Sequence, residues 1–366
     1  MSFVKILKTR LRRRYYWHKN IRVREIWSNG DLNNKASNIT AKLTDEELLE
    51  IKTLWGNDLI NETRIRWFEL YKTIWPDSEL KYFIPYDFYY MYVDEFFAKR
   101  RECKLVDDKN LYDLLFHDVD QPRTIARMIN GIGLSADYQF ITRDEIVSLC
   151  KRAGRVVLKI SVDSEGGKGV TFYDANTDDD EKLWYCINHN WNLVIQEAIR
   201  QHSEMSKIHQ ESINTVRIMT FYFENNVYVL SFVVRMGVGE SKLDNASSGG
   251  IVCGVNQDGR LKNIAFDVKA NKYDIHPSGA HFEDVMVPNF DECLELVQRL
   301  ALRLVKYTRL VSWDFAINEK GRPILIEANL SYGQVDFHQM CNGPIFGNIS
   351  NKVISYVLCH NPFIIK

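Results

Sequence analysis

Three oxygen-bearing side chains in the last fifth of the chain have the types and spacing of a metal site. Asp314 lies in the apolar run 311–317, and Glu327 and Asn329 lie in or next to the run 323–328, with a glycine-containing turn between the runs. The alternation of apolar residues predicts two strands of a hairpin, on which Glu327 and Asn329 point to the same face. Carboxylate and amide oxygens suit Mg²⁺ and leave coordination positions for phosphate oxygens. The alternative is that the acidic residues lie on the polar side of an exposed amphipathic hairpin.

A lysine and a glycine-rich loop in the middle of the chain have the character of a phosphate site. Lys159 lies in the apolar run 156–161, which predicts a buried strand, and a Ser-Glu-Gly-Gly-Lys-Gly loop occupies 164–169. Glycines allow backbone N–H groups to approach phosphate oxygens closely, and Lys159 would add a fixed positive charge. The loop lacks P-loop spacing and is followed by a predicted strand instead of a helix. The alternative is a tight turn next to a lysine whose stem packs on apolar surface.

Two arginines also lie in apolar runs. Arg217 lies in the run 214–220 and Arg235 in the run 230–235, and a polar loop follows at 244–250. Guanidinium groups in predicted strands suit phosphate or carboxylate oxygens, with structural pairing to Asp or Glu as the alternative. Two such arginines flanking one predicted hairpin favour a shared anionic ligand.

The chain as a whole has the composition of a globular protein without a charge bias. It has 366 residues, 45% of them hydrophobic and 26% charged, enough for one large domain or two to three smaller ones. A net charge of −1 gives no sign of a nucleic-acid partner. Seven scattered cysteines without a Cys-x-x-Cys pair favour reduced thiols in a cytoplasmic protein. No apolar run approaches the length of a membrane span, and the N-terminus lacks the apolar core of a signal peptide.

Residues 1–26 differ from the remainder in charge. They contain nine Lys or Arg and one acidic residue, Glu25, with aromatic and aliphatic residues between them. Such a segment is suited to peripheral contact with an anionic membrane at its cytoplasmic face. It could equally cover the acidic body of the protein or be a solvated tail.

The elements that position these residues change character along the chain. Residues 27–103 are predicted to be helical and rich in aromatic residues, and 124–149 to form a β–α unit with a capping box from Thr142 to Glu145. No Gly-x-Gly-x-x-Gly follows a predicted strand, which argues against a dinucleotide-binding fold. A helix is predicted at 291–306. Strands are predicted at 156–161, 170–173, 192–197, 214–223, 227–234, 249–255 and 261–266.

The order of these motifs resembles the ATP-grasp superfamily and, within it, the sugar-transfer-associated ATP-grasp group. The series runs Lys159, the glycine loop, Gln196-Glu197, Thr215-x-Arg217, Arg235, Asn245 with Gly249-Gly250, Asp314 and Glu327-x-Asn329. The resemblance spans residues from about 104 to 347 and implies an α+β fold. Two α+β subdomains would grip ATP, preceded by a helical N-terminal region. The implied divisions are a basic tail (1–26), the helical region (27–103), an α/β part (104–155), a glycine-loop lid (156–196) and a catalytic subdomain (197–366).

The resemblance also implies a role for individual residues. The ATP phosphates would be bound by Lys109 and Lys159 and covered by Gly166, Gly167 and Gly169. The adenine would lie against the hinge formed by Gln196, Glu197, Ala198 and Ile199. Mg²⁺ would be held by Asp314, Glu327 and Asn329. The γ-phosphate and an acyl phosphate would be faced by Arg217 and Arg235, with Asn245 in the same catalytic set.

The implied function is that of an ATP- and Mg²⁺-dependent carboxylate–amine ligase acting through an acyl phosphate. Its substrates would be small-molecule or glycan-linked carboxylates and amines, such as a sugar acid or sugar amine in surface polysaccharide biosynthesis. The alternatives are an ATP-dependent phosphotransferase on the same fold and a non-catalytic nucleotide-binding scaffold for glycosyltransferases.

Three departures from the family pattern affect the expected acceptor substrate more than the expected ATP site. Ser312 stands where many such ligases carry Arg, the residues before position 100 look helical where a Rossmann-like domain is expected, and 330–333 replaces a Pro-Gly continuation. Glu204 is a candidate for ribose contact, with a solvated helix residue as the alternative. Cys341, close to His338 in sequence, is predicted to lie in a loop beside the acceptor site and not to act as a thiol catalyst.

Overall fold

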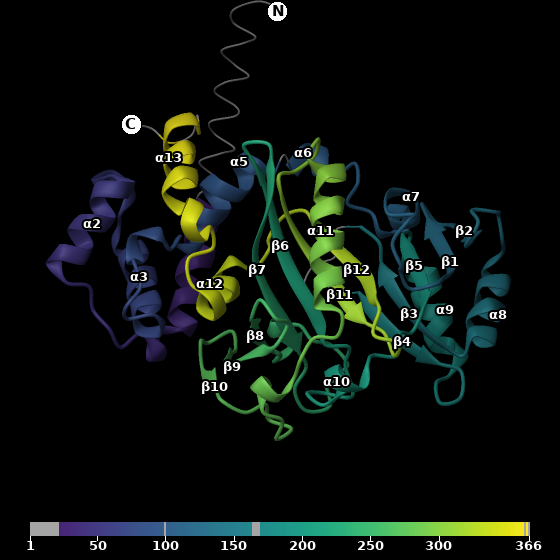
Figure 1. Ribbon diagram of the computed structural model, residues 1–366. Helices are drawn as coiled ribbons and strands as arrows, with labels where there is room; N and C mark the ends of the chain where they lie inside the picture. The colour runs from purple at the N-terminus through teal and green to yellow at the C-terminus, as the bar shows by residue number, and fades with distance from the viewer. Residues whose placement is uncertain (1–21, 99, 163–168, 362–363, 365–366) are drawn as a thin grey trace, which may run out of the picture.

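Two antiparallel sheets and an N-terminal group of helices make up the protein (Figure 1). The computed structural model describes residues 22–98, 100–162, 169–361 and 364. The smaller sheet has the strand order β2-β1-β5-β3-β4, and the larger sheet has the order β10-β9-β8-β7-β6-β11-β12. The α+β fold with a helical N-terminal region is therefore confirmed. Residues 1–21 of the predicted basic tail, and Gly166 and Gly167 of the glycine loop, lie outside the described residues.

Two of the N-terminal helices start at side chains that cap them. Thr44 and Glu47 form a reciprocal capping box at the start of α2, with N···O distances of 3.2 and 2.7 Å. Asn61 accepts a hydrogen bond from Arg64 N at 3.0 Å and caps α3. The α-helices here are the helix at 22–34, α2 (Asp45–Trp55), α3 (Glu62–Ile74), α4 (Tyr86–Phe88), α5 (Glu95–Phe97), α6 (Arg100–Cys103) and α7 (Tyr112–Leu115), with a π-helical segment at Tyr89–Asp94.

The smaller sheet is a compact unit with its own apolar core. Both of its helices pack on it through buried residues such as Ile146 and Ile187. The predicted capping box from Thr142 to Glu145 is confirmed at the start of α8. The elements are β1 (Thr124–Ile129), β2 (Ile132–Ser135), α8 (Arg143–Ala153), β3 (Arg155–Ile160), β4 (Val170–Asp174), α9 (Asp180–His189) and β5 (Leu193–Glu197).

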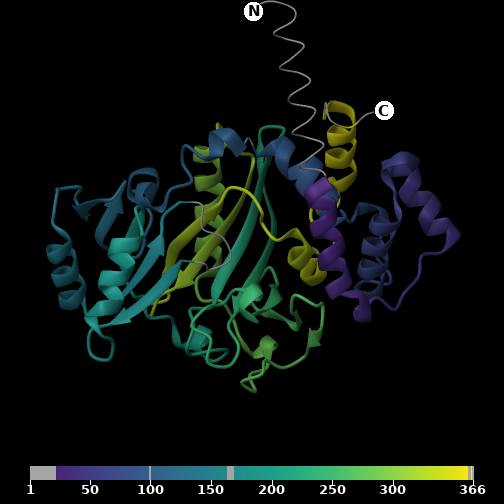
Figure 2. The same ribbon diagram turned by 180° about the vertical axis from the view of Figure 1, so that it is seen from behind.

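The larger sheet has one face covered by α11 and leaves part of the other face for the site. The buried residues of α11 recur at helical spacing and share a core with Trp313 and Phe315 of β11. Figure 1 shows α11 in front of the sheet, and Figure 2 shows the opposite face. The elements are α10 (Ser203–Ser206), β6 (Thr215–Phe223), β7 (Asn226–Met236), β8 (Ile251–Val255), β9 (Leu261–Phe266), β10 (Lys272–Tyr273), α11 (Phe290–Leu304), β11 (Leu310–Ile317), β12 (Pro323–Asn329), α12 (Val335–Asn342) and α13 (Ser350–His360).

Short 3₁₀ turns connect several of these elements. They occur at Ala36–Asn38, Asn57–Leu59, Leu80–Tyr82, Lys109–Leu111, Ala246–Ser248, Phe282–Asp284 and Gly347–Ile349. The stretch around Cys341, predicted to be a loop, is the helix α12, so that prediction is wrong. All seven cysteines are free thiols. Across the described residues, no helix combines the length and apolarity that crossing a membrane requires.

The N-terminal helices and the larger sheet share one apolar core. Trp67 and Phe83 of the helical region belong to the same buried cluster as Phe221 of β6 and Met340 of α12. The Trp75 indole also donates a hydrogen bond to Gln339 O at 2.9 Å. The helical region therefore packs directly against the helix that follows the site-bearing hairpin.

Candidate functional site

The hairpin β11–β12 places the three predicted metal ligands on one face of the larger sheet. Asp314 pairs with Glu327 on one side and with Arg217 of β6 on the other, and Ser312 pairs with Asn329. Directly paired residues of antiparallel strands point to the same face. That face is the one opposite α11. The strand register therefore brings these side chains together, as predicted.

Asp314 is the centre of a buried charge cluster. Arg217 donates to both carboxylate oxygens, from Nε to Oδ1 at 2.7 Å and from Nη2 to Oδ2 at 2.6 Å. Arg235 Nη1 and Asn329 Nδ2 also donate to Oδ2, at 3.0 and 3.2 Å. Burial alone would raise the pKa of Asp314, but the two guanidinium groups hold that pKa below its usual value. Arg217 and Arg235 thus each pair with an acidic side chain of the protein. Such pairing is the alternative to ligand binding that the sequence left open for each of them.

Two lysines meet near Glu327. Lys109 Nζ lies 2.8 Å from Glu327 Oε1, and Lys159 Nζ donates to Gln196 Oε1 at 3.1 Å. Burial lowers the pKa of Lys159 to about 8, a shift that Glu327 opposes and Lys109 reinforces. Lys159 comes from β3 of the smaller sheet and Glu327 from β12 of the larger sheet. The two sheets therefore bring positive charge from one side toward a carboxylate on the other.

The loop at 244–250 is attached to Arg235. The guanidinium donates to Asp244 Oδ1 at 3.3 Å and to the side-chain oxygen of Asn245. Thr215 donates its hydroxyl hydrogen to the other oxygen of Asp244. Asn245, predicted as part of the catalytic set, thus lies beside Arg235, and Asp244 is a partner that the sequence did not assign.

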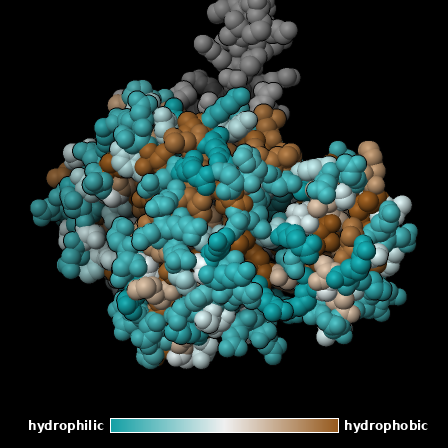
Figure 3. Space-filling view, turned by 45° about the vertical axis from the view of Figure 1, so that its right-hand side comes forward, coloured by the Kyte–Doolittle hydropathy of each residue, from teal (hydrophilic) through white to brown (hydrophobic). Residues whose placement is uncertain are grey.

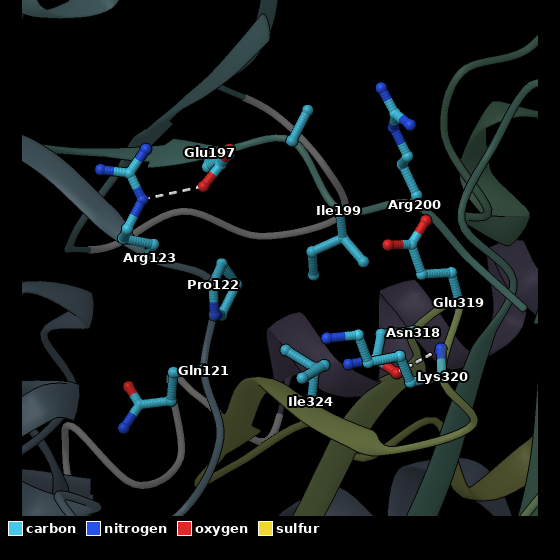
Figure 4. A pocket seen from close by; sticks show the side chains of 11 residues that line it. Gln121, Pro122, Arg123, Glu197, Ile199, Arg200, Asn318, Glu319, Lys320 and Ile324 are labelled. Atoms are coloured by element: carbon cyan, nitrogen blue, oxygen red, sulfur yellow. Dashed lines mark hydrogen bonds and ion pairs between the residues drawn. The ribbon is translucent and has the colours of Figure 1, made fainter. Parts of the chain in front are cut away.

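The predicted adenine hinge borders a cavity of about 430 Å³ (Figure 4). Glu197, Ala198 and Ile199 line it together with the segment before β1, the β11–β12 turn and Ile324 of β12. Glu197 N donates to Arg123 O at 2.9 Å, and the Glu197 carboxylate pairs with Arg123 Nε at 2.9 Å. This volume is in the range of small-molecule sites. Figure 3, which brings the smaller sheet forward, shows a mostly hydrophilic surface hollowed near its centre, where apolar residues are visible.

Comparison with known families gives a match over most of the chain. Residues 91–354 match the family described as sugar-transfer associated ATP-grasp. The chain belongs to this family. No curated protein matches the sequence.

Solved structures similar to this ATP-grasp chain share little sequence with it. D-alanyl-alanine synthetase A from Vibrio cholerae has 12% identity and a TM-score of 0.41, covering 72% of this chain and 65% of its own. The biotin carboxylase domain of Hydrogenobacter thermophilus 2-oxoglutarate carboxylase has 15% identity and a TM-score of 0.43, covering 71% and 47%. L-amino acid ligase from Bacillus licheniformis has 14% identity and a TM-score of 0.40, covering 69% and 48%. The chain spans less than two-thirds of the length of each.

The residues of the ATP-grasp site fit Mg²⁺ by the chemistry of their donors. No group of three His, Cys, Asp or Glu side chains in the described part of the chain is arranged to hold a metal ion. The set here is two carboxylates and one amide, all hard oxygen donors. Glu327 uses Oε1 for Lys109, and Asn329 uses Nδ2 for Asp314 and Ser312. Glu327 Oε2 and Asn329 Oδ1 are the oxygens that these contacts leave for a cation.

Gln334 is a site residue that the sequence did not assign. Its Oε1 accepts a hydrogen bond from Arg217 Nη1 at 2.6 Å, so it holds the other end of the guanidinium that pairs with Asp314. It precedes α12 with a positive φ of 59°. The one available signal was its position five residues after Asn329, in the stretch expected to lie beside the acceptor.

The Cys341–His338 pair is structural, as expected. Both side chains are buried in α12, and burial raises the pKa of the Cys341 thiol well above its usual value. His338 Nδ1 is hydrogen-bonded to Ser231 Oγ at 2.8 Å, and burial lowers its pKa to about 3. A thiol that stays protonated and a neutral imidazole bound elsewhere do not form a nucleophile–base pair. Glu204, the ribose candidate, pairs with Lys207 at 2.6 Å.

Proposed function

We propose that this ATP-grasp protein is an ATP- and Mg²⁺-dependent ligase that joins a carboxylate to an amine through an acyl phosphate. The observation that carries the proposal is the meeting of Lys159, from the smaller sheet, with Lys109 and Glu327 between the two sheets. A buried lysine in an apolar strand is costly unless an anion accompanies its charged form. A triphosphate supplies that anion.

The nucleotide would lie with its adenine in the cavity at the hinge and its phosphates toward the lysines. Gln196 supports this direction, because it adjoins Glu197 in the cavity wall and accepts a hydrogen bond from Lys159. Lys109 and Lys159 would then neutralise the phosphate oxygens. Mg²⁺, held through Glu327 Oε2 and Asn329 Oδ1 with the Asp314 carboxylate beside them, would supply further neutralisation of the transferring phosphoryl group.

In the first step an oxygen of the acceptor carboxylate forms a bond to the γ-phosphorus, and the bond from that phosphorus to the ADP oxygen breaks. Arg217 and Arg235 would stabilise the phosphoryl group and then the acyl phosphate. Asn245 orients Arg235 by accepting its hydrogen bond. In the second step the amine nitrogen bonds to the acyl carbon, the carbon–oxygen bond to phosphate breaks, and the nitrogen loses a proton. The products are an amide, ADP and phosphate.

The acceptor and the amine belong, on this proposal, to surface polysaccharide biosynthesis. The description of the family as sugar-transfer associated supports a sugar acid or a sugar amine as one of the two substrates. The hydrogen bond of Arg217 to Gln334, just before α12, supports a position for the acceptor on the α12 side of the phosphates.

A matrix of acids and amines, assayed for ADP release by the full chain with ATP and Mg²⁺, tests the proposal. We expect ADP release to require one acid and one amine together, and Glu327→Gln to abolish it. Glu46→Gln, on the exposed surface of α2, is the matched control and should retain full activity. ADP release with a hydroxyl acceptor and no acid would identify a phosphotransferase instead. ATP binding without ADP release for any acid–amine pair would favour the nucleotide-binding scaffold, and absence of Mg²⁺-dependent ATP binding would overturn the proposal.

A further inference from the structure

One strand, β12, contributes to both parts of the proposed nucleotide site. Ile324 lines the cavity at the adenine hinge (Figure 4), and Glu327 lies at the metal site, opposite Asp314. The two residues are three apart, so a regular strand would point their side chains to opposite faces. Their partners in β11, Ala316 and Asp314, are only two apart, so the register puts both side chains on one face. β12 must therefore contain an irregularity between them.

That irregularity is a β-bulge at Ile326. Leu325 and Glu327 pair with adjacent residues of β11, which leaves Ile326 without a partner in the register. β12 is also the last strand of the larger sheet, with no further strand on its outer side among the described residues. Backbone N–H and C=O groups on the outer edge of a bulged strand need other hydrogen-bond partners.

Segment 108–121, which precedes the smaller sheet, supplies such partners on both sides of the bulge. On one side, Leu325 N donates to Asp120 O at 2.9 Å. On the other side, the Tyr112 hydroxyl accepts from Ala328 N at 3.1 Å and donates to Ala328 O at 3.3 Å. The phenol thus takes the place of a neighbouring strand for this residue.

The Tyr112 hydroxyl is buried and uncharged. Burial and the nearby carboxylate of Glu327 raise the pKa of Tyr112 well above its usual value. A neutral phenol can donate and accept at once, as its two hydrogen bonds to Ala328 require. Ala328 stands between Glu327 and Asn329 in sequence, so the hydroxyl holds the stretch of backbone that carries both of these ligands.

The same segment is anchored to the smaller sheet. Arg127 Nη1, from β1, donates to Asn110 O at 2.9 Å, and Arg127 Nη2 donates to the Asp113 carboxylate. Lys109 of this segment lies 2.8 Å from Glu327 Oε1. Segment 108–121 therefore joins the lysine side of the site to the metal side.

We propose that Tyr112 is a positioning residue for the cation. Its hydroxyl fixes the bulge of β12, so that Glu327 and Asn329 present their oxygens where the nucleotide phosphates lie, while Ile324 faces the adenine cavity. Groups that hold metal ligands in place from behind contribute to metal affinity, and their loss typically weakens it about tenfold or more. This role rests on the proposed function, because that function supplies the nucleotide and Mg²⁺.

Tyr112→Phe tests the role, because it removes the hydroxyl and keeps the ring in the core. Calorimetric titration of the full chain with the non-hydrolysable ATP analogue AMPPNP, in EDTA and in excess Mg²⁺, gives the affinity without and with the cation. We expect the gain in affinity on adding Mg²⁺ to fall about tenfold in Tyr112→Phe, with the affinity in EDTA unchanged. Hydrogen-exchange mass spectrometry should show faster exchange in the peptide that contains Ala328, because its N–H loses its acceptor, while α11 exchanges as in the wild type.

Tyr173→Phe is the matched control. Tyr173 is buried in the core of the smaller sheet, where its hydroxyl donates to Asp180 Oδ1 at 2.8 Å. This variant should keep the full Mg²⁺ gain and the wild-type exchange at Ala328. An equal Mg²⁺ gain in wild type and Tyr112→Phe, an equal loss in Tyr173→Phe, or a tenfold loss of affinity in EDTA would each overturn the role of Tyr112. The expected loss of Mg²⁺ gain, in a protein that shows no ADP release with any acid and amine, would support the role of Tyr112 and contradict the ligase proposal.

Discussion

Lys159 is buried, and the free energy needed to keep it charged there depends on whether an anion lies near it. Burial lowers its pKa to about 8, with Lys109 acting in the same direction and Glu327 against it. A bound triphosphate favours the charged lysine and raises its pKa, so nucleotide binding takes up a proton at and above pH 8. ATP affinity should therefore be constant below about pH 7 and fall as pH rises through 8. Calorimetry in two buffers of different ionisation enthalpy measures both the affinity and the proton uptake.

Lys159→Arg is the control for this titration, because a guanidinium stays charged over the whole range. Its ATP affinity should be flat between pH 7 and 9, with no proton uptake from this position. A wild-type profile that follows the arginine variant would show that Lys159 does not contact the nucleotide phosphates.

Asp314 separates two buried guanidinium groups, which gives its charge a structural role apart from any metal. In Asp314→Asn the positive charges of Arg217 and Arg235 remain buried without a counter-charge at this position. We expect the free energy of unfolding to fall by about 3–5 kcal/mol. Denaturant unfolding measures it, and Asp118→Asn, which breaks an exposed pair with Arg303, should have a much smaller effect. Similar losses in the two variants would contradict the buried-cluster reading.

Residue types at the site could be predicted from sequence, but their partners could not. Asp314, Glu327 and Lys159 stand out because charged groups are costly in apolar strands. The hydrogen bonds of Arg217 to Asp314 join residues 97 apart in sequence, and only the register of β6 with β11 aligns them. Asp244 gave no such signal, because an acid in a polar loop looks like an ordinary solvated residue.

At the scale of elements, the loop at 244–250 depends on close backbone packing at its end. A Cβ on Gly250 would lie 2.7 Å from Asp244 O and from Met236 O, both backbone atoms that cannot rotate away. Gly250→Ala should therefore displace Asp244 and Asn245 from Arg235. We expect a loss of about 1–3 kcal/mol in unfolding free energy, together with a fall in ADP release. Thermal unfolding and the coupled acid–amine assay measure the two effects.

Gly30→Ala is the matched control for that substitution. Gly30 lies within the helix at 22–34, and nothing lies within 4 Å of a Cβ built there. Alanine in a helix interior should stabilise the protein by about 0.5–1 kcal/mol and leave activity unchanged. An activity loss in Gly30→Ala equal to that in Gly250→Ala would point to a general effect of glycine replacement.

The hairpin strands and the helices α8 and α11 followed from local pattern, and the failure at α12 has a physical reason. The two-residue alternation of the hairpin and the capping box at Thr142 are local features, and they were visible in the sequence. In α12, all seven residues from 335 to 341 are buried, including Asp336 and His338. A helix without a solvent-facing side shows no amphipathic period, so its sequence looks like a loop.

For the whole molecule, the packing between the helical region and the larger sheet is the feature that the sequence did not predict. The helical region before residue 100 looked separate, but it shares a core with β6 and α12. Its contacts join residues far apart in sequence, as in the Trp75–Gln339 hydrogen bond, 264 positions apart. Long-range packing of this kind leaves no local trace. The smaller sheet, in contrast, buries its own cluster around Ile146 and Ile195.

These separate cores predict how the protein opens. The N-terminal helices and the larger sheet should exchange their amide hydrogens with one opening free energy, and the smaller sheet with a lower one. AMPPNP with Mg²⁺ should bridge Lys159 on the smaller sheet and Glu327 on the larger one, and so stabilise the closed arrangement. Hydrogen-exchange mass spectrometry should then show slower exchange in β3 and β5 on adding the nucleotide. Lys159→Met should lose this protection while the N-terminal helices exchange as before. Protection confined to the larger sheet would mean that nucleotide binding does not join the two sheets.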